Sequence, residues 1–182
     1  RWGNPQNYDR GNSSNQILDS QHSVNWIESG SPGEGNLILF NNGHSNNSSA
    51  ALEFITPINN NGTYDIANTD AYEPSSYTWI HQGGFFSDVQ SGAFRQPNGN
   101  TLITDANSSD IFEVTYDGEV IWEYDVPGNN MMVPRAQKYG YEYFDSTNSL
   151  GDLNEDGIIN VLDIISTVNI ILGNSDYNNN GD

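Results

Sequence analysis

Short runs of alternating or continuous apolar residues, separated by turn residues, fill the first 150 positions of the chain. Runs of this length that are rich in Val, Ile, Phe, Tyr and Trp are typical of β-strands. Gly33-Glu34-Gly35-Asn36, Pro97-Asn98-Gly99-Asn100 and Asp117-Gly118 interrupt them and favour hairpin turns. The pattern predicts strands at residues 24–27, 37–40, 51–55, 77–80, 92–95, 101–104, 111–114 and 119–124.

The predicted strands form two similar sets. Three segments of the first set have counterparts in the second: residues 35–39 with 99–103, 52–54 with 112–114, and 78–80 with 121–123. Each set ends on a strand that carries a tryptophan, Trp79 or Trp122. A short four-stranded unit that recurs in this way is typical of a β-propeller blade. Trp2 then ends a preceding blade whose other strands are absent.

The predicted fold class is therefore mainly β: an incomplete β-propeller of about two four-stranded antiparallel blades with flanking strands. A closed propeller needs about four to eight blades, and two blades leave faces and strand edges unpaired. Either upstream blades are missing from this chain, which we favour, or other chains supply them. Residues 57–76 are expected to form an irregular surface loop, and residues 131–139 a closing strand beside the first blade.

The hydrophobic pattern changes to a helical period after Asn160. Asn160 is a suitable N-cap and Gly173 a suitable C-terminal residue. Between them one apolar helix face is formed by Val161, Ile164, Ile165, Val168, Ile171 and Leu172. One such helix buries little surface alone, so it needs the β body, another chain or further residues as a partner.

The twelve residues 152–163 have oxygen-bearing side chains at positions 1, 3, 5, 9 and 12 and Gly157 at position 6. This is the spacing of an EF-hand-type calcium loop, in which position 7 contributes its backbone carbonyl. Position 12 is Asp163 in place of the usual Glu. The predicted Ca²⁺ ligands are Asp152, Asn154, Asp156, the carbonyl of Ile158, Asn160 (directly or through water) and Asp163. The alternative interpretation is a solvated Asp/Asn loop that only caps the helix.

Composition narrows the possible partners. Among 182 residues, 24 are Asp or Glu and only 5 are Lys or Arg, which gives a net charge of −19. Nucleic acids and anionic membrane surfaces bind basic patches, so neither is an expected partner. No apolar run reaches the roughly 18–20 residues that span a bilayer. Because a calcium loop is most readily occupied outside the cell, we expect an extracellular, secreted protein that is a trimmed product or one piece of a longer chain.

These motifs carry two family resemblances. The loop 152–163, its apolar helix and the Asp/Asn-rich residues 176–182 resemble a type I dockerin with a truncated second repeat. The β part resembles the C-terminal half of bacterial arylsulfate sulfotransferase-like propellers, most specifically at Arg1-Trp2-Gly3 and Gln21-His22. The resemblances imply propeller blades at residues 1–144, a linker at 145–150 and a dockerin-like calcium-binding segment at 151–182.

The arylsulfotransferase resemblance implies transfer of a sulfuryl group between phenols through a transiently sulfated histidine, without a nucleotide donor. On the matching positions, His22 is the candidate channel-facing histidine and Arg95 the candidate anion-binding donor. Each has a simpler alternative: His22 as a hydrogen-bonding strand residue and Arg95 as the partner of an acidic side chain. Gln90 stands where relatives often have a histidine, and the upstream blades are absent. Whether the chain is an enzyme therefore stays open.

Two functions are compatible with the sequence. The first is a secreted bacterial calcium-binding propeller protein, resembling arylsulfotransferases, that attaches to a protein partner through its dockerin-like tail and acts on an aryl sulfate. The second is a non-catalytic extracellular scaffold, or a subunit of an oligomer or filament that assembles through blade edges and the calcium-loaded tail.

Overall fold

The structure, a computed structural model, describes residues 2–45, 47–64, 69–128, 132–140, 143, 151–154 and 158–173. The chain divides into two compact units, Arg1–Lys138 and Tyr139–Asp182. In the described ranges, we find no helix with the length and apolar character needed to cross a membrane.

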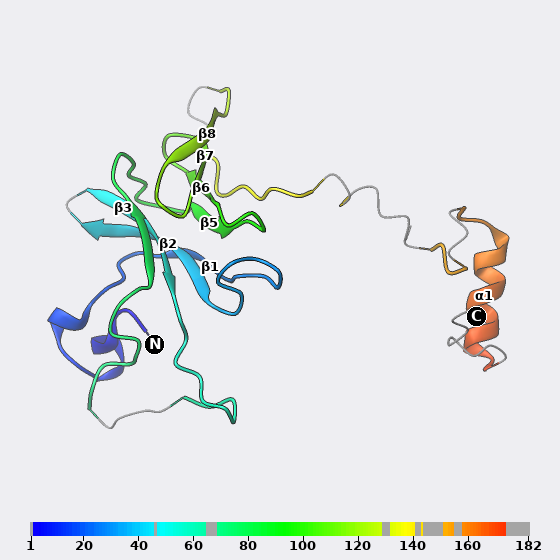
Figure 1. The fold of residues 1–182 in the computed structure, drawn as a ribbon, viewed down its shortest axis with the longest axis horizontal. Coiled ribbons are helices and arrows are strands. Elements are labelled where there is room, and N and C mark those ends of the chain that lie inside the picture. The colour runs from blue at the N-terminus through cyan, green and yellow to red at the C-terminus, as the bar shows by residue number, and fades with distance from the viewer. Residues whose placement is uncertain are drawn as a thin grey trace. The chain divides into compact units, whose positions relative to one another are not determined.

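The first unit is mainly β and contains two four-stranded antiparallel sheets, each with its strands in chain order (Figure 1). Two short 3-10 helices, η1 (Pro5–Tyr8) and η2 (Ser13–Asn15), precede them. The first sheet consists of β1 (His22–Trp26), β2 (Leu37–Ser45), β3 (Ser48–Phe54) and β4 (Trp79–Gln82). The second sheet consists of β5 (Gly92–Arg95), β6 (Thr101–Asp105), β7 (Asp110–Val114) and β8 (Val120–Asp125).

The two predicted sets of four strands are therefore confirmed, with bounds that differ by a few residues. The described residues close neither a barrel nor a propeller. The local sequence pattern was sufficient to predict the strands, because the side chains of a strand alternate between the two faces of a sheet. In β2, Ile38 and Phe40 join one core cluster, while Leu39 joins the other with Leu37 against it. Because both of its faces are covered, β2 reads as a nearly continuous apolar run.

The two sheets pack face to face. Their shared core consists of Ile27, Ile38, Phe40, Ala51 and Trp79 from the first sheet or its flank, and Ala93, Ile103, Phe112 and Val114 from the second. The ladders pair Ile38 with Glu53 and Glu53 with Trp79, so these three side chains share the face toward the second sheet. We call this side of the first sheet its front face and the opposite side its back face. In the second sheet, the front face is the equivalent side, which carries Leu102, Glu113 and Trp122, and the back face is the side that packs on the first sheet.

The back face of the first sheet is covered by the N-terminal segment. Trp2 stacks on Phe54 with ring centroids 3.9 Å apart, and Leu18 lies in the same cluster. As predicted, the described part of residues 57–76 contains no regular strand. This segment also contacts the N-terminal segment. The guanidinium of Arg10 lies 4.8 Å from the centroid of the Tyr72 ring.

The predicted closing strand at residues 131–139 is wrong, because residues 132–140 contain no strand. The backbone N–H of Ala136 donates to Thr104 Oγ1 at 2.9 Å, and Lys138 Nζ lies 2.6 Å from Glu113 Oε2. The segment thus bonds to side chains of the second sheet, not to a strand edge, and Pro134 has no N–H for a ladder. We call residues 132–138 the covering segment.

The second unit contains helix α1 (Val161–Ile171), as predicted. Asn160 Oδ1 accepts the N–H of Leu162 at 2.7 Å, and Asp163 Oδ2 accepts the N–H of Asn160 at 2.7 Å. This reciprocal capping box fixes the start of the helix. Gly173 follows the helix with a φ of 71°, which glycine adopts without strain. The predicted linker 145–150 and the residues of the second loop, 176–182, lie outside the described residues.

Loss of the N-cap is expected to melt part of this helix. An isolated helix of eleven residues is marginal in water, and removing an Asn cap costs about 1 kcal/mol. We therefore expect Asn160→Ala to reduce the helical circular-dichroism signal of the chain in the presence of a chelator. Ile171→Ala, at an exposed position of the same helix, should leave the signal unchanged. Equal losses in both variants would contradict the capping role.

Candidate functional site

The loop before α1 is organised around the carboxylate of Asp163. Its Oδ1 accepts the backbone N–H groups of Leu153 at 2.8 Å and Asn154 at 3.3 Å, and its Oδ2 accepts that of Asn160. The N–H of Asn160, followed by those of Asn154 and Leu153, holds the pKa of Asp163 below its ordinary value, although burial opposes the shift. One side chain on the helix thereby joins the start and the end of the loop.

The structure describes all the other predicted calcium ligands except Asp156. Asp152 is 7% exposed and Asp163 is 4% exposed, so both acidic ends of the loop are buried. Asn160 is at the N-cap, and its Nδ2 donates to the carbonyl of Ile158 at 3.0 Å. Asn154 lies beside Leu153 at the start of the loop, where its N–H bonds to Asp163. Asp156 lies outside the described residues.

These residues fit a calcium ion chemically. Burying a carboxylate is costly unless a cation or hydrogen bonds compensate it. Residues 139–182 contain no Lys, Arg or His, so no basic side chain of the second unit can neutralise Asp152 and Asp163. Carboxylate, amide and carbonyl oxygens are the ligands that Ca²⁺ prefers in proteins. Bound Ca²⁺ would supply positive charge at the point where the chain buries two acids.

His22 stands at the start of β1 and is exposed. Its Nδ1 lies 2.9 Å from Asn42 Oδ1 and 3.0 Å from the carbonyl oxygen of Ser20. Asn42 is oriented by its amide nitrogen, which donates to the carbonyl oxygens of Ser87 at 2.8 Å and Gln90 at 3.2 Å. Since Nδ1 faces two acceptors, it carries the proton of the neutral ring, and Nε2 is the nitrogen with a lone pair.

Arg95 stands at the end of β5 and is buried. Its guanidinium forms an ion pair with the carboxylate of Glu53, and its NH1 donates to Thr101 Oγ1 at 2.7 Å and to the carbonyl of Gly99 at 3.1 Å. Its Cζ lies 4.5 Å from the ring centroid of Trp79. This geometry matches the alternative interpretation, in which Arg95 is the partner of an acidic residue. A role in binding a sulfuryl group stays a prediction.

Among the described residues, His22 and Arg95 have no hydrogen-bond partner in common. The ring of His22 is bonded to Ser20 and Asn42, whereas the guanidinium of Arg95 is bonded to Glu53, Gly99 and Thr101. A cavity of about 460 Å³ on the back face of the first sheet contains neither of them. Among the described residues, its lining includes Trp2, Phe54, Tyr72 and Glu73 but no Lys, Arg or His.

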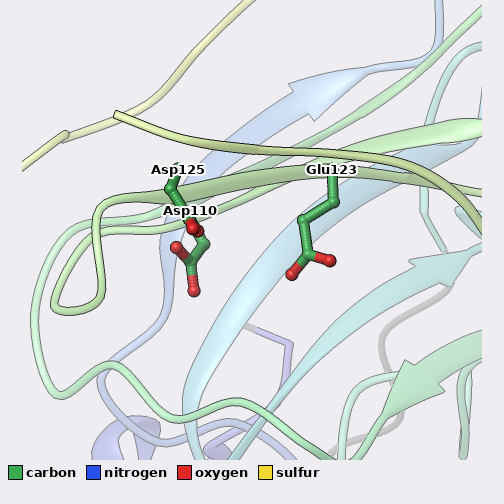
Figure 2. Close-up of side chains that lie close together, drawn as sticks. All are labelled: Asp110, Glu123 and Asp125. Atoms are coloured by element: carbon green, nitrogen blue, oxygen red, sulfur yellow. The ribbon is translucent and has the colours of Figure 1, made fainter. Parts of the chain in front are cut away.

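An acidic cluster at one end of the second sheet was not found from the sequence. Asp110, Glu123 and Asp125 place carboxylate oxygens within 4.8 Å of one another (Figure 2). Counting outward from the turn between β7 and β8 would not pair Asp110 with Asp125. A register shift between Glu113 and Val114 brings them opposite each other. Burial, together with a hydrogen bond that protonated Asp110 donates to Asp125 and the charges of Asp125, Asp105 and Glu123, raises the pKa of Asp110 to about 6.

This raised pKa predicts a distinct pH dependence of stability. The folded state disfavours ionised Asp110, so its contribution to the free energy of unfolding rises as pH falls from about 6 toward 4. Asp110→Asn should remove this contribution and raise the free energy of unfolding at pH 7.5 by about 1 kcal/mol. A rise of the pKa from 3.8 to about 6 corresponds to roughly 3 kcal/mol, and the partial exposure of Asp110 reduces this value. Urea unfolding at pH 7.5 and pH 5 measures the effect. Asp117→Asn, in the exposed turn, is the control, and an equal effect of both changes would contradict the prediction.

The fold and the site define a class: a mainly β body of two repeated antiparallel sheets, followed by a separate loop–helix unit with acidic residues buried at its loop. Comparison with protein-family models, with curated proteins and with solved structures gave no match.

Proposed function

We propose that this protein is a non-catalytic, calcium-dependent attachment protein that acts outside the cell. The loop 152–163 binds one Ca²⁺, and helix α1 then presents its apolar face to a protein partner. The observation that carries the proposal is the burial of Asp152 and Asp163 in a unit without any basic residue. A cation would add positive charge where the loop buries two carboxylates.

The exposed apolar side chains of α1 support an attachment role. Val161, Ile164 and Leu172 are exposed, and Ile171 is 76% exposed. Contiguous apolar surface of this kind marks binding sites in soluble proteins. A helix fixed at one end by a calcium loop is a rigid ligand, so it loses little conformational entropy when it binds. We therefore propose a protein surface with an apolar groove as the partner.

The body is proposed to be two blades of a β-propeller. Support comes from the equal order of strands in both sheets and from two glutamates at equal register positions, Glu53 and Glu113. The resemblance to arylsulfotransferase-like propellers stays part of this proposal. A catalytic role is less well supported than a scaffold role, because Arg95 is buried in an ion pair and, among the described residues, shares no hydrogen-bond partner with His22.

Calorimetric titration with CaCl2, after treatment with a chelator, tests the proposal. We expect one site per chain with a dissociation constant between about 1 µM and 1 mM, the range of sensors and extracellular modules. Asp152→Asn should weaken binding at least about tenfold, and Asp117→Asn should not change it. A chain that binds no calcium at several millimolar would exclude the proposed function.

Two further measurements separate the alternatives. Sulfuryl transfer from an aryl sulfate, lost in His22→Ala, would favour the enzyme over the scaffold. Light scattering with calcium and with chelator reports assembly. A change from monomer to oligomer on adding calcium would assign the partner as another copy of the chain, whereas a monomer in both conditions favours a different protein.

A further inference from the structure

The contact between the two sheets has a partial copy at the N-terminus. The indole N–H of Trp79, in the last strand of the first sheet, donates to the carbonyl of Tyr116 in the β7–β8 turn of the second sheet at 2.7 Å. The indole N–H of Trp2 donates in the same way to the carbonyl of Pro74, in the β3–β4 connection of the first sheet. The same contact therefore occurs twice: a tryptophan donates its indole N–H to the loop between the third and fourth strands of the following sheet.

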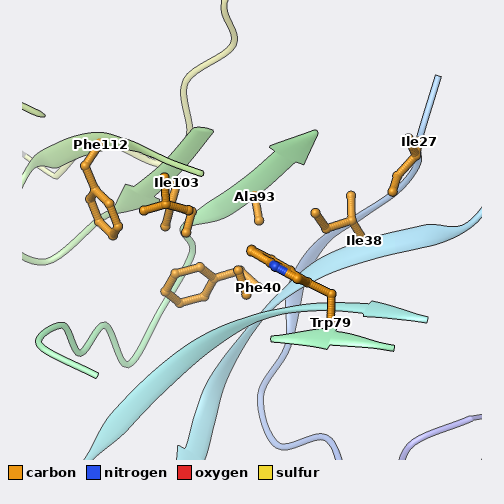
Figure 3. Close-up of a cluster of buried hydrophobic side chains, with 9 residues drawn as sticks. Ile27, Ile38, Phe40, Trp79, Ala93, Ile103 and Phe112 are labelled. Atoms are coloured by element: carbon orange, nitrogen blue, oxygen red, sulfur yellow. The ribbon is translucent and has the colours of Figure 1, made fainter. Parts of the chain in front are cut away.

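A glutamate and an arginine form a second element of the contact between the two sheets, beside the tryptophan. Glu53, on the front face of the first sheet, accepts a hydrogen bond from Asn36 Nδ2 at 2.6 Å and pairs with Arg95. Arg95 is the last residue of β5, the first strand of the following sheet, and it lies over the ring of Trp79. Figure 3 shows Trp79 and Ile38 among the side chains of both sheets that form this contact.

The front face of the second sheet carries the same set of groups. Leu102 pairs with Glu113 and Glu113 with Trp122, exactly as Ile38, Glu53 and Trp79 are paired in the first sheet. Asn100 Nδ2 donates to Glu113 Oε1 at 2.7 Å, as Asn36 does to Glu53. Trp122, however, is 46% exposed, whereas Trp79 is 6% exposed.

The covering segment stands where a following sheet would be. Lys138 gives Glu113 the positive charge that Arg95 gives Glu53, but the lysine side chain is 57% exposed. The N–H of Ala136 bonds to Thr104, on the same face. The segment bonds to Thr104 and Glu113, which are buried, whereas Trp122 and Tyr124 are exposed. The face is thus only partly occupied.

We propose that the front face of the second sheet is a docking site for a further four-stranded antiparallel sheet whose first strand ends in arginine. In the absence of that sheet, the covering segment 132–138 occupies the face, with Lys138 in the place of the arginine. This inference rests on the interpretation of the sheets as propeller blades, and it is independent of calcium binding. The partner sheet supplies a guanidinium for Glu113 and a backbone carbonyl for the indole of Trp122.

A second copy of this chain does not meet these requirements through its first sheet. Trp26 pairs with Leu37 at the register position at which Arg95 pairs with Thr101, so the back face of the first sheet has no arginine there. Trp2 and Leu18 already lie on that face. The occupant is therefore a sheet with the pattern of β5–β8, not the first sheet of another copy.

A chain with a duplicated second sheet tests the inference. Residues 83–125 are inserted once more after Asp125, so that the junction repeats the natural passage from β4 to β5. The inserted copy carries Trp122→Phe, which gives the β8 peptides of the two copies different masses. We expect hydrogen exchange of β8 in the original copy to be at least about tenfold slower than in the parent chain. A matched chain, with Arg95→Met in the inserted copy only, should lose most of this protection.

Far-ultraviolet circular dichroism first shows whether the inserted strands are folded. Unchanged exchange of the original β8 in a chain with the added β signal would overturn the proposal, because the chain then offers the correct sheet and the face does not bind it. Equal protection in the Arg95→Met chain would also overturn it, because the arginine is part of the claim. Calcium titration of the same chain reports separately on the tail. Loss of calcium binding with retained protection would refute the proposed function and leave this inference standing.

Discussion

Replacing Arg95 by methionine is expected to lower the free energy of unfolding of the β body by about 3–5 kcal/mol, because it leaves the buried charge of Glu53 without its partner. Glu53 is 5% exposed, and its remaining donor is the neutral amide of Asn36. The change also removes the cation from the ring of Trp79. Urea unfolding followed by tryptophan fluorescence measures the loss.

Lys138→Met is the matched control, since Lys138 pairs with the equivalent Glu113 but is largely exposed. It should cost less than Arg95→Met, because Glu113, although buried, keeps the amide donors of Asn98 and Asn100, and because water reaches the lysine side of this ion pair. The double variant Glu53→Leu/Arg95→Met is expected to recover much of the loss, because a buried ion pair pays a large desolvation penalty. Equal losses in Arg95→Met and Lys138→Met would show that burial does not distinguish the two pairs.

Replacing Asp163 by alanine is expected to weaken calcium binding by about 100-fold or more, because the predicted site loses the carboxylate at its twelfth position. The same change removes the acceptor for the N–H groups of Leu153, Asn154 and Asn160. The helical signal should therefore fall even in the presence of chelator. Calorimetry and far-ultraviolet circular dichroism measure the two effects separately.

Asp163→Asn separates charge from hydrogen bonding at this position. Its amide oxygen still accepts N–H groups, so the helix should be retained in part, while the loss of negative charge should still weaken calcium binding strongly. Asp117→Asn removes one exposed carboxylate from the first unit and controls for net charge. If Asp163→Ala binds calcium as tightly as the parent, this loop is not the calcium site.

The two expected results concern buried acids in different settings. Glu53 is neutralised within the protein by a side chain from the next sheet. Asp163 is surrounded by backbone N–H groups in a unit that has no basic residue. In the first arrangement the protein itself supplies the counter-charge, whereas in the second the unit contains no basic side chain that could do so. This difference supports the proposal of a scaffold role for the body and a calcium-dependent role for the tail.

The sequence by itself determined the local structure. Alternating apolar residues, with turns such as Asp117-Gly118 between them, were enough for all eight strands, because the period of a strand and the conformation of a turn depend on neighbouring residues. The repeat of Glu53 in Glu113 and of Trp79 in Trp122 also held at the level of strand register. The start of α1 followed from Asn160, since a cap acts within one turn of its helix.

Only the tertiary structure decided which distant groups meet. Arg95 and Glu53 are 42 residues apart, and no local pattern distinguishes their pairing from an exposed arginine that binds an anion. The register shift in β7–β8 brought Asp110 to Asp125, and a covering segment that reads as a strand bonds to side chains instead. Such contacts depend on how whole sheets pack, because a side chain's partner is set by the position of the surface opposite it and not by its neighbours in the chain.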